Sequence, residues 1–489
     1  KMLVNDPNTE TIILFLETLR NSDEVAEMSR MAHAAGKQII CYKLGKSELG
    51  KELAKSHTGA IAGNDDAFNA FINYHGIARV EIFETLIEIP NLFKNKKKPV
   101  SKRVGIVTTT GGGGAMVVES LSGSDIEIVD PGLSIKKIMQ ENNIAFNNNK
   151  LVDLTIAGTK PEIVNEVISQ MMKNKNCDLV VMVVGSSAKF RPEQAVEPLL
   201  KWANYPKPLA VYVAPDAPEA LTLLHKNNIA CFRTPESCAE SVKTFLNTKN
   251  PVKPKILKND LSNISKKLKK NISKNLSEEE ALEIFKDIGI QIVNYKVSCN
   301  EKQAVEHSSQ IGFPLVMKVL SNQILHKTET GGVELNIKNL EELKISFEKL
   351  SDVFQKLKIN SSDEKFLIQK METGIAEIIL GYRVDELVGP IVVIGSGGVL
   401  SEIYNDKSIR MAPVDITEAN KMIREVKSLV TITGYRGLPQ ADINIIASAI
   451  VNMSKFAFVK EIKEAEINPI IVKKENEGIV AVDGLITLY

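Results

Sequence analysis

The first part of the chain alternates short apolar runs with segments of helical spacing, and this alternation limits the fold more than any other feature. The runs Thr11–Glu17, Gln38–Leu44 and Ile77–Val80 have the length of buried strands, and Asp23–Ala35 has helical spacing. Strands that alternate with helices form a parallel sheet whose two faces are covered. We therefore expect a doubly wound α/β domain over residues 1–98.

A second set of the same kind follows a basic, proline-containing stretch that is typical of a solvated connection. The predicted strands of this set are Val104–Thr109, Ile126–Val129, Leu179–Val184 and Leu209–Val213, with helices between them. This pattern predicts a second doubly wound α/β domain over residues 99–248.

Lysine dominates the next stretch. Thr248–Asn275 contains one acidic residue, Asp260, and shows no sustained apolar period. We expect a flexible linker over residues 249–275. A basic tract can bind nucleic acid, but this one has no aromatic side chain on which bases could stack.

The last part of the chain, residues 276–489, is of a different class. It opens with a helix that Ser277 can cap, with Glu280 completing a capping box. Short strands and hairpins then dominate, and two helices, Thr417–Val430 and Gln440–Val459, interrupt them. This pattern predicts an α+β domain.

Composition excludes several classes of protein. The 489 residues carry 61 basic and 60 acidic side chains, a net charge of +1, which gives no general attraction to nucleic acid or to an anionic membrane. No apolar run approaches the ~20 residues of a membrane-spanning helix. The five cysteines are scattered without a CxxC pair, which argues against a disulfide framework or a zinc site and favours a reducing, cytoplasmic setting.

Two motifs in the α/β part are suited to phosphate. Ser56 and His57 lie in SHTGAIAG, where small residues leave an imidazole open to a bulky group and a helix follows. Gly111–Gly114 follow a predicted strand and precede a helix, so their backbone N–H groups can approach an anion closely. Taken alone, a loop histidine is more often structural, and a run of glycines can be a plain flexible turn.

The last part of the chain gathers polar residues of another kind. A lysine, an arginine and several oxygen ligands could together hold a nucleotide with Mg²⁺, which prefers carboxylate and carbonyl oxygens. The glycine pairs in HKTETGGV and GSGG could cover its phosphates. Individually, each polar residue could equally be an edge-strand or surface residue. The candidates are Lys318, His326, Glu377, Arg410, Glu466, Asn468 and Asp483.

The ordered set SHTGAIAG, TTTGGGG, HKTETGGV, the DxxxGP of Asp385–Pro390, GSGG and EINP resembles the NDP-forming acyl-CoA synthetases, which include ADP-forming acetyl-CoA synthetases and the related succinyl-CoA synthetases. The resemblance covers nearly the whole chain. It implies two flavodoxin-like domains followed by an ATP-grasp domain. It also implies the reaction acyl-CoA + ADP + phosphate ⇌ acid + CoA + ATP, through an acyl phosphate and a phosphohistidine.

The resemblance also implies roles for single residues. His57 matches the phosphorylated histidine, Glu17 the glutamate that orients its ring, and His326 a second histidine that relays phosphate to ADP. The helix after His57 and the helix after Gly111–Gly114 resemble the pair whose N-termini cradle the phosphohistidine. Lys318 and Glu377 match nucleotide-contacting positions, and Arg410 is kept as a further candidate there. Asn468 and Asp483 match Mg²⁺ ligands, with Glu466 as a neighbour.

The chain also departs from the family pattern. It begins within the first flavodoxin-like domain and nothing in it corresponds to the family's CoA-binding domain, so we expect that domain upstream or on a partner chain. The expected acid is short, either acetate or a hydroxy acid such as 3-hydroxypropionate or 4-hydroxybutyrate, and a homodimer is expected by analogy. Two other functions stay open: a nucleotide-binding or regulatory module without turnover, and a carboxylate–amine ligase of the ATP-grasp type.

Overall fold

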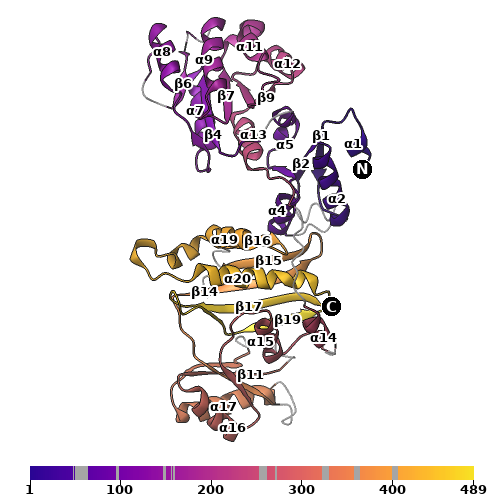
Figure 1. Ribbon diagram of the computed structural model, residues 1–489, viewed down its shortest axis with the longest axis vertical. Coiled ribbons are helices and arrows are strands. Elements are labelled where there is room, and N and C mark those ends of the chain that lie inside the picture. The colour runs from indigo at the N-terminus through magenta and orange to yellow at the C-terminus, as the bar shows by residue number, and fades with distance from the viewer. Residues whose placement is uncertain are drawn as a thin grey trace. The chain divides into compact units, whose positions relative to one another are not determined.

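The computed structural model divides into two compact units, residues 1–65 with 72–253, and residues 66–71 with 254–489 (Figure 1). Each unit is described by itself. The described residues are 1–47, 49, 64–94, 98–146, 150–155, 157, 160–252, 261–269, 273–321, 330–356, 364–398 and 406–489.

The first unit contains two parallel sheets. Strands β1 (Thr11–Leu16), β2 (Gln38–Lys43) and β3 (Ala78–Val80) form one sheet in chain order. The second sheet has the order β5-β4-β7-β8-β9, with β6 also paired to β4. Its strands are β4 (Arg103–Thr108), β5 (Glu127–Ile128), β6 (Leu151–Asp153), β7 (Leu179–Val184), β8 (Leu209–Val213) and β9 (Ala230–Phe232). All of their pairings are parallel.

Helices cover both faces of the second sheet. All six residues of β7 are buried. Val180, Met182 and Val184 enter one core, whereas Leu179, Val181 and Val183 enter the other. Such two-sided burial is what a continuous apolar strand of a doubly wound sheet requires. The helices of this unit are α1 (Met2–Asn5), α2 (Ser22–Ala34), α4 (Asp65–Tyr74), α5 (Phe83–Glu88), α6 (Pro90–Phe93), α7 (Gly111–Leu121), α8 (Leu133–Glu141), α9 (Pro161–Lys173), α10 (Ser187–Phe190), α11 (Pro192–Leu200), α12 (Pro218–Lys226) and α13 (Pro235–Asn247).

The two sheets of this unit share a core and a buried polar contact. Ile40 and Val80 of the first sheet belong to the same apolar cluster as Val104 and Phe232 of the second. Beside this cluster, the hydroxyl of Ser237 on α13 donates to the Glu88 carboxylate of α5 at 2.7 Å. The first sheet is therefore anchored to the second by apolar packing and by a hydrogen bond.

An acidic group at the start of β7 makes the stability of the first unit depend on pH. Asp178 accepts hydrogen bonds from the guanidinium of Arg103 at 3.0 and 3.1 Å and from Ser101 Oγ at 2.7 Å. Burial by itself would raise the pKa of Asp178, but these bonds and the Arg103 charge outweigh it and hold the pKa below its ordinary value. This contribution to stability is present above the unfolded pKa and is lost as the pH falls through the folded one.

The variant Asp178→Asn is expected to lower the unfolding free energy at pH 7 by about 1–3 kcal/mol. It should also flatten the loss of stability between about pH 5 and pH 2, because the group that titrates in the wild type is gone. Denaturant unfolding at several pH values measures both effects. Asp125→Asn is the control, since the Asp125 side chain is 64% exposed. A wild-type acid slope in Asp178→Asn would contradict the assignment.

The second unit contains two antiparallel sheets. The smaller has the order β10-β13-β11-β12, from β10 (Tyr295–Ser298), β11 (Leu315–Val319), β12 (Val333–Ile337) and β13 (Phe366–Lys370). The larger has the order β16-β15-β14-β17-β18, with β19 also paired to β17. Its strands are β14 (Ala376–Asp385), β15 (Gly389–Ser396), β16 (Lys407–Met411), β17 (Ile462–Val472), β18 (Ile479–Ala481) and β19 (Gly484–Leu488).

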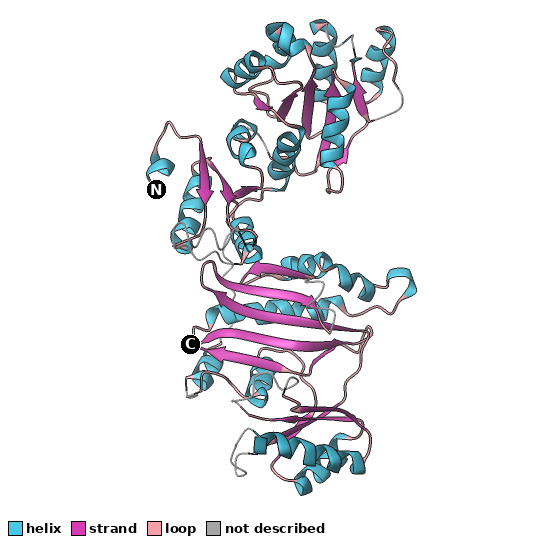
Figure 2. Cartoon of the chain, turned by 180° about the vertical axis from the view of Figure 1, so that it is seen from behind, coloured by secondary structure: helices cyan, strands magenta, loops and turns pink. Residues whose placement is uncertain are grey.

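Helices lie on one face of the larger sheet, as the two opposite views in Figures 1 and 2 show for α19 and α20. Their apolar side chains join alternate residues of β14, β15 and β17 in one core. Three of the other helices described in this unit, η3, η4 and η5, are 3₁₀ helices. The full set is α14 (Ser262–Leu268), α15 (Glu278–Asp287), α16 (Glu301–Ile311), α17 (Leu340–Lys356), α19 (Ile416–Glu425), η3 (Lys427–Ile432), η4 (Tyr435–Gly437), α20 (Ile443–Ser454) and η5 (Lys455–Phe458).

Part of the stretch predicted as a flexible linker is folded. Helix α14 lies inside residues 249–275, and Ile264 and Leu268 are buried in the core of the second unit. These two residues are four apart and share one helix face, a signal too short to stand out among lysines. The capping box of α15, Ser277 with Glu280, is present as predicted. The domain boundaries at residues 98, 248 and 275 stay a prediction.

Helices α16 and α17 were missed by the sequence analysis, which predicted strands and hairpins between the helix capped by Ser277 and residue 417. Among the described residues, no helix combines the length and the hydropathy that crossing a membrane needs.

Candidate active site

The glycine run of the first unit forms the first turn of α7, directly after β4. Three of its members are packed closely. A Cβ on Gly111 would lie 2.6 Å from Asp153 Oδ2, one on Gly113 would lie 3.0 Å from Val183, and one on Gly114 would lie 2.8 Å from Thr108 Cγ2. Gly112, by contrast, has nothing within 4 Å of a Cβ. The turn thus presents one open backbone position at the N-terminus of an 11-residue helix.

Asp153 is a neighbour that the sequence analysis did not select. It ends β6, which pairs with β4, and its Oδ1 accepts from the backbone N–H of Thr155 at 2.9 Å. The other carboxylate oxygen faces Gly111. The carboxyl ends of adjacent parallel strands lie at the same edge of a sheet. The position of Asp153 at the end of β6 is therefore the signal that could have placed it near the glycine turn.

Two glycine variants test whether the space around each glycine decides the effect of adding a Cβ. Gly114→Ala is expected to lower the unfolding free energy by about 1–2 kcal/mol, because the overlap with buried Thr108 exceeds what alanine gains in helix propensity. Gly112→Ala should leave stability equal or slightly higher. Denaturant unfolding of the two variants provides the comparison, and equal losses in both would be inconsistent with the packing described.

Of four further predicted residues, only Glu17 lies in the described part of the chain. Ser56, His57 and His326 lie outside the described residues. Glu17 follows the last residue of β1 and is half-buried at the carboxyl end of that strand. The carboxyl ends of parallel strands are where ligands bind in α/β folds.

Lys318 is the centre of the best-defined polar cluster. It lies in β11, and its Nζ donates to Glu278 Oε1 at 2.7 Å, Asp483 Oδ2 at 2.9 Å and the Val482 carbonyl at 2.9 Å. The Lys318 and Glu278 side chains are 5% and 1% exposed. Burial by itself lowers the pKa of Lys318, but the charges and hydrogen bonds of Glu278 and Asp483 outweigh it and raise the pKa, so the ammonium stays charged.

Two further oxygen-bearing residues, Asn468 and Glu466, lie beside this cluster. Asn468 Nδ2 donates to Glu466 Oε1 at 3.2 Å on β17. Val482 N–H donates to the Pro469 carbonyl, and Ile467 pairs with Gly484, so Asp483 lies next to Asn468. Burial raises the pKa of Glu466, the Asn468 bond lowers it, and Glu464 and Asp483 raise it further, leaving it above its ordinary value. The structure thus brings four predicted residues together.

This donor set fits Mg²⁺ because it consists of oxygens. Among the described residues, no three His, Cys, Asp or Glu side chains are placed to hold a metal ion by themselves. Mg²⁺ commonly takes one or two carboxylates together with nucleotide phosphates. Asp483, Glu466 and the amide oxygen of Asn468 are suited to that arrangement.

Two residues of the cluster were not selected from the sequence. Glu278 stands in an acidic run, EEE, that reads as a plain helix start. Gln369 of β13 is 2% exposed and donates from Nε2 to the Val482 carbonyl at 3.1 Å. Its Oε1 is buried without a hydrogen-bond partner in the described part of the chain. No local pattern marks either residue, because each acquires its role from a strand distant in sequence.

Glu377 lies on β14, next to the GSGG loop. Gly397 N–H donates to the Glu377 carbonyl at 2.7 Å, and a Cβ on Gly397 would lie 2.9 Å from the Glu377 carbonyl carbon. Glu377 pairs with Ile471, three residues along β17 from Asn468. The loop and Glu377 therefore border the same strand pair as Glu466 and Asn468.

Arg410 is not brought to this group. It pairs with Val392 across β16 and β15, and Val392 faces the core under the helices. Its guanidinium donates to Glu418 Oε1 at 2.7 Å and to Glu425 Oε1 at 2.5 Å, both on α19. Paired residues share a face of a sheet. Arg410 therefore lies on the helix-covered face, whereas Glu466 alternates with the core residues Ala465 and Ile467 and faces the other side.

Comparisons with known proteins agree with these observations. The family described as the succinyl-CoA ligase-like flavodoxin domain matches residues 1–93, and the ATP-grasp domain family matches residues 267–488. The ADP-forming 4-hydroxybutyrate–CoA ligase of Nitrosopumilus maritimus is 26% identical over 501 residues, which cover 100% of this chain and 72% of that protein. The ADP-forming acetate–CoA ligase of Methanocaldococcus jannaschii is 28% identical and covers 97% of this chain and 70% of that protein.

A third relative decides the family. The beta subunit of the ADP-forming acetate–CoA ligase I of Pyrococcus furiosus is 39% identical over 212 residues, which cover 43% of this chain and 90% of that subunit. The chain belongs to the family of ADP-forming acid–CoA ligases. The predicted fold class, flavodoxin-like α/β with an α+β ATP-grasp domain, is confirmed, and so is the prediction of a ligase of this family. The Lys318 cluster of this acid–CoA ligase lies within residues 267–488, the part of the chain that the ATP-grasp family matches.

Proposed function

We propose that this chain carries the phosphohistidine and nucleotide parts of an ADP-forming acid–CoA ligase, for the reaction acid + CoA + ATP ⇌ acyl-CoA + ADP + phosphate. The observation that carries this proposal is the buried ammonium of Lys318 between Glu278 and Asp483, beside the Glu466–Asn468 pair. A fixed positive charge next to oxygen ligands is the arrangement that binds a nucleoside polyphosphate with its cation.

His57 is proposed as the nucleophile that takes the phosphoryl group, with Glu17 orienting its ring and His326 relaying phosphate to and from the nucleotide. A carboxylate on one ring nitrogen leaves the other free to attack. Ser56 and the open turn at Gly111–Gly114 are proposed to bind the phosphoryl oxygens. Lys318 and Glu377 are proposed to contact the nucleotide.

Asp483, Asn468 and Glu466 are proposed to hold Mg²⁺, which neutralises phosphate charge during transfer. Arg410 remains a candidate only for an indirect role, since its guanidinium is bonded to α19. CoA is proposed to bind to a domain upstream or on a partner chain. The separate subunit of the Pyrococcus furiosus relative supports such a division. A homodimer and a cytoplasmic location are part of the proposal.

The test is phosphorylation of the purified chain by Mg-ATP labelled at the γ-phosphate. We expect a label that is stable to base, labile to acid, and removed by added ADP, because phosphoryl transfer to the nucleotide is reversible. The variant His33→Ala is a matched control, since His33 is an exposed histidine of the same unit. Bound Mg-ADP without any label would instead favour a nucleotide-binding module. If no phosphohistidine forms, hydroxamate formation from the acid and hydroxylamine in the absence of CoA would favour a carboxylate–amine ligase.

A further inference from the structure

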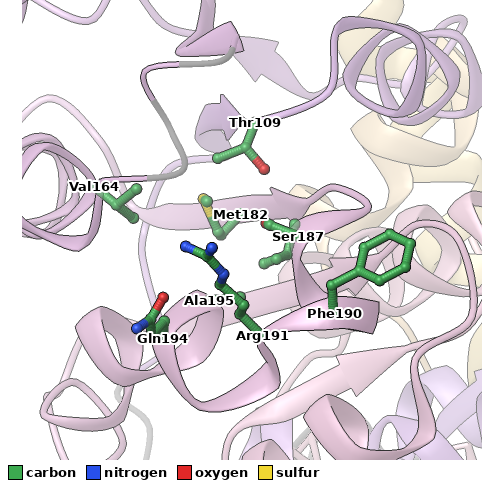
Figure 3. A pocket seen from close by; sticks show the side chains of 9 residues that line it. Thr109, Val164, Met182, Ser187, Phe190, Arg191, Gln194 and Ala195 are labelled. Carbon is green, nitrogen blue, oxygen red and sulfur yellow. The ribbon is translucent and has the colours of Figure 1, made fainter.

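A cavity of about 320 Å³ opens in the first unit at the carboxyl ends of β4 and β7, between α9 and α11 (Figure 3). Its inner wall is apolar, from Val164, Met182 and Val184, all buried. Its polar lining residues are Thr109, Ser187, Arg191 and Gln194. A small cavity with both apolar and polar lining residues suits an amphipathic small molecule.

The cavity adjoins the glycine turn of α7. The Gly185 N–H donates to Thr109 Oγ1 at 2.8 Å, and the Thr109 N–H donates to the Val183 carbonyl at 2.9 Å. A Cβ on Gly185 would lie 3.1 Å from Thr110 Cβ. The loop after β7 and the turn before α7 are therefore packed together, and Thr109, which lines the cavity, lies two residues before the glycine run.

Arg191 supplies a cation without a fixed partner. Its guanidinium has no hydrogen bond or ion pair with any residue that the structure describes. In Figure 3 it extends from the start of α11 into the space bounded by Val164 and Met182. A guanidinium over an apolar wall selects an anion with an apolar body, and its planar fork matches a carboxylate.

We propose that this cavity is the pocket for the acid substrate, with the carboxylate against Arg191 and Thr109 and the hydrocarbon chain on Val164, Met182 and Val184. This inference rests on the proposed function and adds the substrate class. The lining also includes Ser187 and Gln194, whose hydroxyl and amide can form hydrogen bonds with a polar group on the acid. The cavity is about ten times the ~30 Å³ that one water occupies. The preferred acid is therefore longer than acetate.

Binding of a series of acids to the full chain tests the proposal, with isothermal titration of acetate, butyrate, hexanoate, 4-hydroxybutyrate and inorganic phosphate as the probes. Affinity should rise about fourfold for each added methylene until the wall is covered. 4-Hydroxybutyrate should bind about as tightly as butyrate, because Ser187 and Gln194 of the lining can form hydrogen bonds with its hydroxyl.

Three variants sharpen the test. Arg191→Gln should weaken every acid by about 10- to 100-fold, since a charge-assisted pair is lost. Lys189→Gln removes an exposed cation nearby and should leave binding unchanged. Val164→Phe should block hexanoate, and Ala195→Val narrows the same cavity from a half-buried position if the first variant does not fold.

The outcomes are distinct. Wild-type affinity in Arg191→Gln, equal affinity for all acids, or displacement of the acids by phosphate at equal concentration would overturn the proposal. A chain that is phosphorylated by Mg-ATP yet binds no acid would refute the pocket and leave the proposed function standing. A chain that binds acids through Arg191 but is never phosphorylated would support the pocket and refute the proposed function.

Discussion

Replacement of His57 by alanine is expected to remove the phosphoryl label that Mg-ATP gives the chain, by a factor on the order of 10³ or more. The proposed nucleophile is then absent, and neither Glu17 nor the glycine turn can form a phosphoryl bond of the same lability to acid. Mg-ADP affinity should stay near the wild-type value, because the proposed nucleotide residues lie within the ATP-grasp match, residues 267–488. Label incorporation and ADP titration of the same preparation measure the two effects.

His326→Ala provides the comparison for this variant. If His326 relays phosphate, the label should be lost from Mg-ATP but should still form on His57 from a chemically prepared acyl phosphate. His57→Ala should fail with both donors. A wild-type label in His57→Ala, or an equal loss of ADP affinity in both variants, would contradict this division of roles.

Lys318→Met is expected to lower the unfolding free energy of the second unit by about 3–5 kcal/mol, because it removes the ammonium that pairs with the buried Glu278 carboxylate. Asp483 is affected less, since 36% of its side chain is exposed. The same variant should lose most of its affinity for Mg-ADP. Denaturant unfolding and nucleotide titration report the two losses separately.

Two further variants distinguish charge from packing at this site. Lys318→Met combined with Glu278→Leu should recover most of the stability but none of the nucleotide affinity, because an apolar pair can replace a buried ion pair. Lys296→Met, on the exposed side of β10 in the same sheet, should change stability by no more than about 0.5 kcal/mol. If the single variant Lys318→Met were as stable as the wild type, the stabilising role assigned to the Lys318–Glu278 ion pair would be wrong.

Much of the fold of the first unit could be predicted because its signals are local. Leu179–Val184 and Leu209–Val213 are continuous apolar runs, and both strands have the predicted bounds. The short strands β6 and β9 were missed. In the second unit, α14 was missed because two buried residues, Ile264 and Leu268, are its whole apolar signal among lysines.

The candidate site shows the same difference between what local sequence patterns predict and what tertiary contacts decide. Lys318, Asp483, Glu466 and Asn468 were selected from motifs, and the structure brings them together. Arg410 was selected with them, yet strand pairing turns it to the other face of the sheet, a consequence of register that its neighbours in sequence do not reveal.

The sequence by itself determined the succession of elements, the glycine turn and the family, because apolar period, turn residues and motif order act over a few residues each. Only the tertiary structure decided which side chains meet. Glu278 lies 40 residues before Lys318, and Asp483 lies 165 residues after it. Their contact arises where the two sheets of the second unit pack, and the acid cavity likewise arises where β7 meets α9 and α11. Such contacts depend on register and packing, for which no local pattern of residues is sufficient.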